Sequence, residues 1–146
     1  MSLSFKQGKA FFDLINSIIA FSARRFGLCS EDEAARFALY HDDDLLRREA
    51  LRSFWEDPTA LDDMIAAQGT SFSPKQRAAL KRFSHRYSGP SLLVGFDFDG
   101  RALMTVGDST VAVSSLAKDL TSMLAGRIPR IIDVTLLPFE DLIVYD

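Results

Sequence analysis

The sequence predicts an α+β fold in which a helical half packs with an antiparallel sheet. Helical periodicity prevails over residues 1–88, where apolar side chains recur at intervals of three and four. At Ser88-Gly89-Pro90 the period changes to the alternation typical of strands, and Asp99-Gly100 is the dipeptide that two-residue hairpin loops favour. With 146 residues we expect a single domain: about five helices in 1–88, then four to five strands and one more helix in 89–146.

The helices are predicted from their start and stop signals. A broad apolar stripe begins near Phe5 and ends at Gly27. Ser30 with Glu33, and Ser73 with Gln76, have the spacing of capping boxes. The expected helices cover residues 5–26, 30–40, 42–55, 58–69 and 74–87.

The strands are predicted from β-branched and apolar runs that turn residues separate. Asp99-Gly100 would join the first two strands, and residues 138–141 would form the turn of a final hairpin. A helix is expected at 115–124, closed by Gly126. The expected strands cover 92–98, 102–106, 111–113, 131–137 and 142–145.

The C-terminal segment LLPFEDLIVYD, residues 136–146, resembles the signature of an uncharacterised bacterial domain. In that family an apolar strand, a Pro-Phe turn and an Ile-x-Tyr-Asp strand recur, sometimes beside a small zinc-binding SEC-C motif. The resemblance extends more weakly to Phe11–Phe26, to Leu51–Pro58 and to Phe72–Phe83. It implies no known activity and no catalytic residues. The Cys-rich motif is missing from this sequence, so the resemblance implies no zinc.

Composition restricts the class of protein. Hydrophobic residues make up 47% of the chain and charged residues 25%, which excludes general disorder. The only cysteine, Cys29, excludes an intramolecular disulfide and a multi-cysteine zinc site. The apolar run at 11–21 is interrupted by Asp13 and Asn16, and it is shorter than a membrane span. We therefore expect a cytoplasmic protein with no membrane association and no cofactor.

Asp97 and Asp99 are the first candidate site. Asp97-Phe98-Asp99-Gly100 after an apolar strand is locally similar to the nucleophile motif of haloacid-dehalogenase-type phosphatases. Arg101 stands where that motif has Thr, and too little chain follows to supply the rest of that fold. Asp97 and Asp99 also fail as a calcium loop, because the sixth position lacks Gly and the twelfth lacks Glu. A hairpin turn is the favoured interpretation.

Two further groups of residues are candidate sites. His41 with Asp42–Asp44 could suggest a metal site, but neighbouring residues point in different directions, so a solvated helix cap is favoured. Cys29 with His41 or His85 could suggest a nucleophile and base, but nothing in the sequence marks the thiol as activated. Neither a metal site nor a catalytic residue is assigned.

The charge pattern supplies the last candidate. Residues 64–96 hold five basic and no acidic residues, whereas 31–63 hold eleven acidic residues, in a chain of net charge −3. The cations of the expected helix 74–87 are a candidate partner contact, and they are Lys75, Arg77, Lys81, Arg82 and Arg86. Such a helix can contact phosphates, but in an acidic chain a position near the acidic helices of its own chain or of a partner subunit is favoured.

Together these features favour a non-catalytic interaction or regulatory module over an enzyme. Its partner would be another protein or a second copy of the chain, and nucleic acid is not expected. The alternatives are a nucleic-acid-associated regulator that uses helix 74–87 and, third, a small metal-dependent hydrolase at Asp97 and Asp99.

Overall fold

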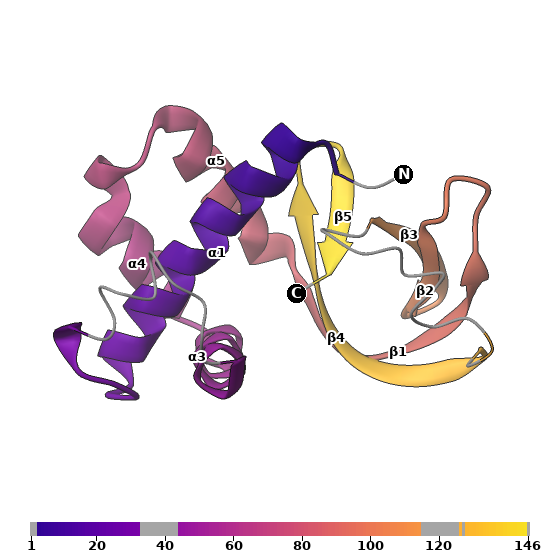
Figure 1. Ribbon diagram of the computed structural model, residues 1–146, viewed down its shortest axis with the longest axis horizontal. Coiled ribbons are helices and arrows are strands. Elements are labelled where there is room, and N and C mark those ends of the chain that lie inside the picture. The colour runs from indigo at the N-terminus through magenta and orange to yellow at the C-terminus, as the bar shows by residue number, and fades with distance from the viewer. Residues whose placement is uncertain (1–2, 33–43, 115–125, 127, 146) are drawn as a thin grey trace. The chain divides into compact units, whose positions relative to one another are not determined.

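The computed structural model describes residues 3–32, 44–114, 126 and 128–145, which form two compact units (Figure 1). We call Lys9–Lys81 the helical unit. Met1–Gly8 and Arg82–Asp146 together form the barrel unit. The barrel unit is therefore built from the first residues of the chain and from its second half.

Four α-helices and two short 3₁₀ turns occur in the described residues. α1 begins with the reciprocal hydrogen bonds of a capping box, from Gln7 N to Ser4 Oγ (3.2 Å) and from Ser4 N to Gln7 Oε1 (3.1 Å). It ends where Gly27 adopts a φ of +63° and Leu28 N donates to Ala23 O. The bounds are α1 Phe5–Arg25, α3 Asp44–Glu56, α4 Ala60–Gln68, η1 Gly69–Ser71, α5 Pro74–Arg82 and η2 Phe83–His85.

An ion-pair cluster in the helical unit joins the end of α1 to the residues around the start of α4. Arg25 donates to Asp63 Oδ2 at 2.6 Å and to Asp57 Oδ2 at 3.2 Å. The Asp63 hydrogen bond is the main reason that the pKa of Arg25 is raised. Hydrogen bonds from Thr59 are the main cause of the lowered pKa of Asp57. These carboxylates therefore have a structural role.

Five strands close into a barrel in the order β1-β2-β3-β5-β4, with β4 returning to β1 (Figure 1). Three consecutive strands and a fourth that returns beside the first make a Greek key, which β5 closes. β5 lies parallel to β3, and the other four pairs are antiparallel. The bounds are β1 Tyr87–Phe96, β2 Ala102–Val106, β3 Ser109–Ser114, β4 Arg130–Phe139 and β5 Leu142–Tyr145.

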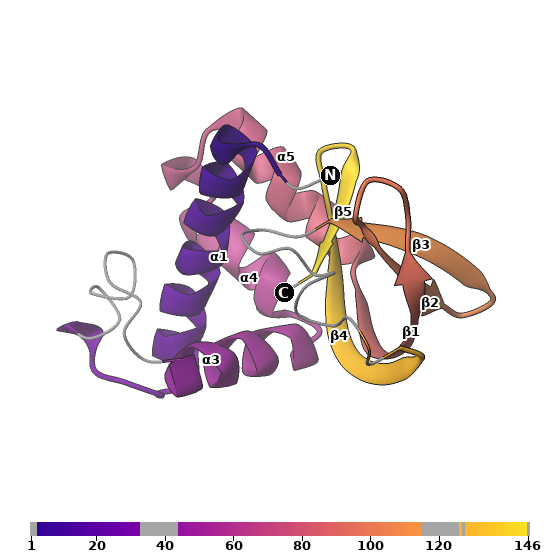
Figure 2. The ribbon, with the colours of Figure 1, turned by 45° about the vertical axis from the view of Figure 1, so that its right-hand side comes forward.

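The two ten-residue strands each pair with two neighbours in succession. β1 pairs with β4 along Tyr87–Leu93 and with β2 along Leu93–Phe96, and its register with β2 shifts between Leu93 and Gly95. β4 pairs with β1 along Arg130–Leu136 and with β5 along Leu136–Phe139. A register shift of this kind bends β1, and Figure 2 shows β4 strongly curved. The curvature lets five strands close.

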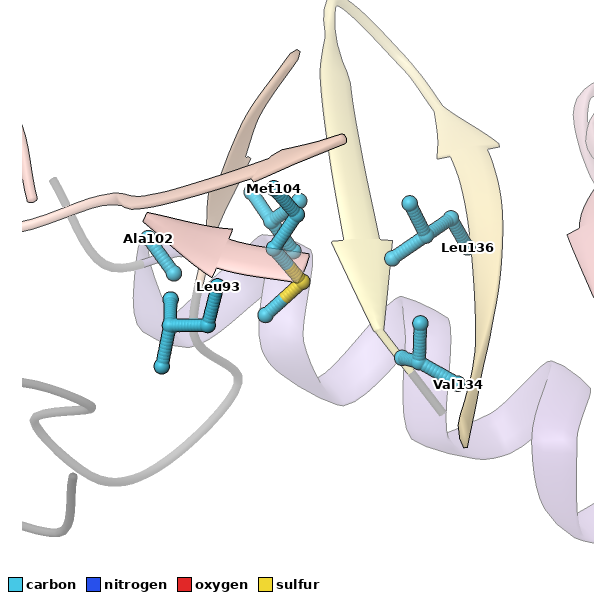
Figure 3. Packing of buried hydrophobic residues seen from close by; sticks show 6 residues of the cluster. Leu93, Ala102, Met104, Val134 and Leu136 are labelled. Atoms are coloured by element: carbon cyan, nitrogen blue, oxygen red, sulfur yellow. The ribbon is translucent and has the colours of Figure 1, made fainter. Parts of the chain in front are cut away.

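Apolar side chains fill the barrel because they alternate along the strands. Leu93 on β1 and Met104 on β2 are directly paired and almost completely buried (Figure 3). Tyr87, Ile132 and Ile143 are partly buried against the same cluster. The buried members of the cluster are Leu93, Ala102, Met104, Val113, Val134 and Leu136.

Several predictions are confirmed. The final hairpin forms: β5 covers the predicted Leu142–Tyr145, and Leu136, Leu137 and Phe139 are buried. Its turn is shorter than the expected 138–141, because β4 continues to Phe139 and only Glu140 and Asp141 form the turn. β2 has the predicted bounds. Ser73 and Gln76 form the predicted capping box, with Gln76 N donating to Ser73 Oγ (3.1 Å) and Ser73 N to Gln76 Oε1 (2.8 Å).

Other predictions were wrong. The fifth helix ends at Arg82 and not near residue 87, because Tyr87 is already paired with Leu136 in the barrel. The described residues contain four α-helices, not about five; most of the expected helix 30–40 and all of the expected helix 115–124 lie outside them. The sheet is mixed, not antiparallel, because β3 and β5 close the barrel in parallel.

Candidate functional site

The β1–β2 turn, Asp97–Arg101, contains the first candidate residues. Gly100 N donates to Asp97 O (3.1 Å), Asp97 N donates to Arg101 O (3.0 Å), and Gly100 has a φ of +76°. This is a three-residue hairpin loop in which a glycine of positive φ follows the turn. The predicted hairpin is confirmed, and so is the role of Gly100, but the expectation of a two-residue loop was wrong.

The Asp97 carboxylate holds the turn together. Its Oδ1 accepts hydrogen bonds from Asp99 N (3.0 Å) and Arg101 N (2.9 Å). Its Oδ2 accepts from Arg101 Nε at 2.7 Å, and the Arg101 guanidinium also lies 3.7 Å from Asp99 Oδ2. Both carboxylate oxygens of Asp97 are thus engaged within the turn. Hydrogen bonding from a side chain to nearby backbone is the usual function of Asp in turns.

We expect Asp97→Asn to flatten the acid dependence of stability. Burial raises the pKa of Asp97, but the hydrogen bonds from Arg101 and Asp99 and the Arg101 charge outweigh it, so the pKa lies below the ordinary 3.8. The carboxylate therefore stabilises the fold above that value, and this contribution disappears as the pH falls through the lower folded pKa. When thermal midpoints are measured from pH 6 to pH 2, the midpoint of the variant should fall less with decreasing pH than that of the wild type. An equal fall in the two proteins would contradict the stabilising role of the Asp97 carboxylate.

The side chain at the tip of this turn, Phe98, is fully exposed, with a relative exposure of 111%. It is therefore presented to solvent by a hydrogen-bonded turn and does not pack into the core. A large exposed aromatic residue has no stabilising function in an isolated domain, whereas aromatic residues are enriched in protein interfaces.

Four of the exposed large apolar residues of the barrel unit lie at the same end of the barrel. β1 runs toward the β1–β2 turn, and β4, antiparallel to it, starts there, since Leu93 pairs with Arg130. Val94 follows Leu93, Ile131 follows Arg130, and Ile128 lies two residues before Arg130. We call this end, with Val94, Phe98, Ile128 and Ile131, the turn end. Exposed apolar side chains of this kind are candidates for contact with a partner.

The opposite end of the barrel is held by Glu140, the turn residue of the β4–β5 hairpin. Glu140 has a φ of +51°, which is uncommon for a residue other than glycine. Its backbone carbonyl accepts from Arg82 Nη1 (2.6 Å), and its Oε2 accepts from Gln7 Nε2 (2.7 Å). Contacts among three parts of the chain therefore hold this turn, and they explain how Glu140 keeps its uncommon backbone conformation.

The five predicted basic contact residues do not form one uniform helical surface. Lys75, Arg77 and Lys81 belong to the helical unit, whereas Arg82 and Arg86 belong to the barrel unit. Arg82 donates to Glu140 O. Arg86 lies beyond α5; it is half-buried, donates to Phe83 O (3.4 Å), and burial lowers its pKa. Two of the five cations thus have contacts that stabilise the barrel unit.

The remaining candidates belong to different units: Cys29 lies in the helical unit and His85 in the barrel unit. Cys29 is half-buried, and His85 is exposed in η2. His41 and Asp42–Asp43 lie outside the described residues. Among the residues that the structure describes, no group of three or more His, Cys, Asp or Glu could hold a metal ion.

Comparisons with protein-family models, with curated proteins and with solved structures found no match. Within the described chain, the helices are too short or too polar to cross a membrane.

The sequence interpretation missed the turn end. Phe98 was expected to be the last residue of a strand at 92–98, so it was treated as part of the sheet and not as part of a turn. The signal that could have shown otherwise is its position between two Asp residues directly before Gly100. The pattern Asp-x-Asp-Gly is typical of a turn, so the apolar residue within it is expected at the tip of that turn.

Proposed function

We propose that this protein is a non-catalytic interaction module that binds another protein through the turn end of its barrel. The observation that carries the proposal is Phe98, which is fully exposed although it belongs to a turn with an extensive hydrogen-bond network. A rigid turn loses little conformational entropy when it binds, so an aromatic residue fixed there is suited to be an anchor. Val94 and Ile131 supply further apolar surface at the same end.

A contact residue of this kind can be tested by site-specific photocrosslinking. With a photoreactive phenylalanine analogue at position 98, we expect a discrete crosslinked product in lysate from the source cell. The same analogue at position 108, in the exposed β2–β3 turn, serves as the control because Asp108 lies at the opposite end of β2. Equal crosslinking patterns at the two positions, or none at position 98, would contradict the proposal.

Binding of single-stranded nucleic acid is the second candidate. A five-stranded Greek-key barrel is the architecture of OB-folds, which bind oligonucleotides, so this candidate rests on analogy of fold. An exposed aromatic residue such as Phe98 could also stack on a base. The local charge opposes it, because Asp97 and Asp99 flank Phe98 and Arg101 is paired with them. This charge favours a protein partner.

We therefore expect no specific complex with nucleic acid. At ~0.15 M salt, mixing with single-stranded RNA or duplex DNA should give no affinity better than the ~10⁻⁴–10⁻⁶ M of non-specific binding. Gel shifts at several salt concentrations measure this. A nanomolar complex would contradict the preference for a protein partner over nucleic acid. Loss of that complex in Phe98→Ala would assign it to the barrel, and loss in Lys75→Glu/Lys81→Glu would assign it to α5.

A further inference from the structure

The first part of β4, Arg130–Thr135, has a neighbouring strand on one side only within the described residues. β1 pairs with all six of these residues. On the other edge of β4, pairing with β5 begins only at Leu136. Figure 1 shows β4 as one long curved strand, with β5 beside its last part. We call Arg130–Thr135 the β4 edge.

A strand edge of this kind presents unpaired backbone N–H and C=O groups, which are a template for a further strand. Proteins usually shield such edges with lysines, prolines or bulges. The β4 edge has charged residues at 130 and 133 but no lysine or proline, and its four β-branched residues, at 131, 132, 134 and 135, favour extended structure. Ile131 keeps a relative exposure of 72%, so its outward side chain is accessible.

The side chains of the edge specify what an added strand would have to carry. Ile132 and Val134 face the barrel core, so Ile131, Asp133 and Thr135 face outward. An added strand would run antiparallel to β4, because it would continue the line of β5, which is antiparallel. Residues directly opposite would lie ~4.5–5.5 Å apart at Cβ and would interact as cross-strand pairs.

We propose that the β4 edge binds an extended segment of a partner protein as an antiparallel strand. The segment carries an apolar residue opposite Ile131 and a cation opposite Asp133, with apolar residues opposite the two inward-facing positions. Main-chain hydrogen bonds supply the affinity in this mode of recognition, and the alternating side chains supply the specificity. The inference rests on the proposed function as an interaction module, and it names a second contact, on the strand that begins near the turn end.

A pair of synthetic peptides with the same composition tests the proposal. The six residues TVKVVE, read from the position opposite Thr135 to the position opposite Arg130, place Lys opposite Asp133 and Glu opposite Arg130. The control TVEVVK exchanges the two charges and keeps the net charge. Both peptides carry Gly-Ser flanks and a fluorophore, and binding is measured by fluorescence anisotropy.

The wild-type protein should bind TVKVVE about three to ten times more tightly than TVEVVK, since cross-strand charge pairs have effects of that size. Arg130→Glu/Asp133→Lys should reverse the preference, and both substituted positions are exposed, so the fold should persist. Absence of binding at millimolar peptide, or a preference that the variant does not reverse, would overturn the proposal.

Two further arms separate the alternatives. A wild-type dimer that Ile131→Lys converts to a monomer would show that a second copy occupies the edge, and would also overturn the proposal. Phe98→Ala should leave peptide affinity unchanged. Crosslinking at position 98 without peptide binding would therefore reject the strand site alone, and peptide binding without that crosslinking would reject only the role of Phe98.

Discussion

Phe139→Ala should lower the free energy of unfolding by about 3–5 kcal/mol, the usual cost of removing a buried phenylalanine ring. Phe139 has a relative exposure of 3% and is the last residue of β4, paired with Leu142 of β5. The neighbouring Glu140 is held by Gln7 and Arg82. Because the backbone is fixed on both sides, the cavity has little freedom to collapse. Denaturant unfolding followed by circular dichroism measures the loss.

Phe98→Ala is the matched control, since it deletes the same ring from a fully exposed position. Its free energy of unfolding should stay within about 0.5 kcal/mol of the wild type, as for other surface substitutions. The pair of variants therefore separates a structural phenylalanine from a contact phenylalanine. Similar losses in both variants would show that Phe98 packs into the fold, and would remove the main support for the proposed function.

Gly89→Ala should cost about 1–3 kcal/mol, the usual energy of a residue held in a sparsely populated backbone region. Gly89 lies within β1 at a φ of +148°, which side chains of L-residues rarely adopt. A Cβ there would lie 3.4 Å from the Tyr87 hydroxyl, an ordinary contact, so the cost comes from the backbone and not from a clash. Thermal unfolding should show a lower midpoint.

Gly95→Ala is the control for this substitution because it lies in the same strand. Apart from its chain neighbours, no atom lies within 4 Å of the place that a Cβ would take at Gly95, and its φ is not in the positive range. Alanine at a compatible position restricts the unfolded chain, so the midpoint should be unchanged or higher. If the thermal midpoint fell equally in both variants, any added side chain on β1 would be destabilising. That result would contradict the explanation that the cost at Gly89 comes from its backbone conformation.

Features governed by local chemistry were predictable from the sequence. The apolar stripe and the stop at Gly27 predicted α1, Ser73 and Gln76 predicted the start of α5, and Pro138–Asp141 predicted the final hairpin. Each depends on residues close together in the chain. Periodicity, caps and turn residues act at that range.

Features governed by distant contacts were not predictable. Gly89-Pro90 is a local signal for a break, yet both residues lie within β1, opposite Val134 and Asp133 of β4. The parallel pairing of β3 with β5 involves only Val113–Ser114 and Ile143–Val144, and neither strand carries a sign of its partner. The candidate surface depends on the same contacts, because the turn end exists only once β1 and β4 are paired.

The role of the turn end as a binding surface can be measured directly once a partner has been captured at position 98. Isothermal titration calorimetry gives the affinity of that partner for the wild-type protein and for Phe98→Ala. We predict a loss of at least about 2 kcal/mol of binding free energy, the threshold for an interface hot spot, with an unchanged thermal midpoint. An equal affinity for the two proteins would contradict the claim that the turn end is the binding surface.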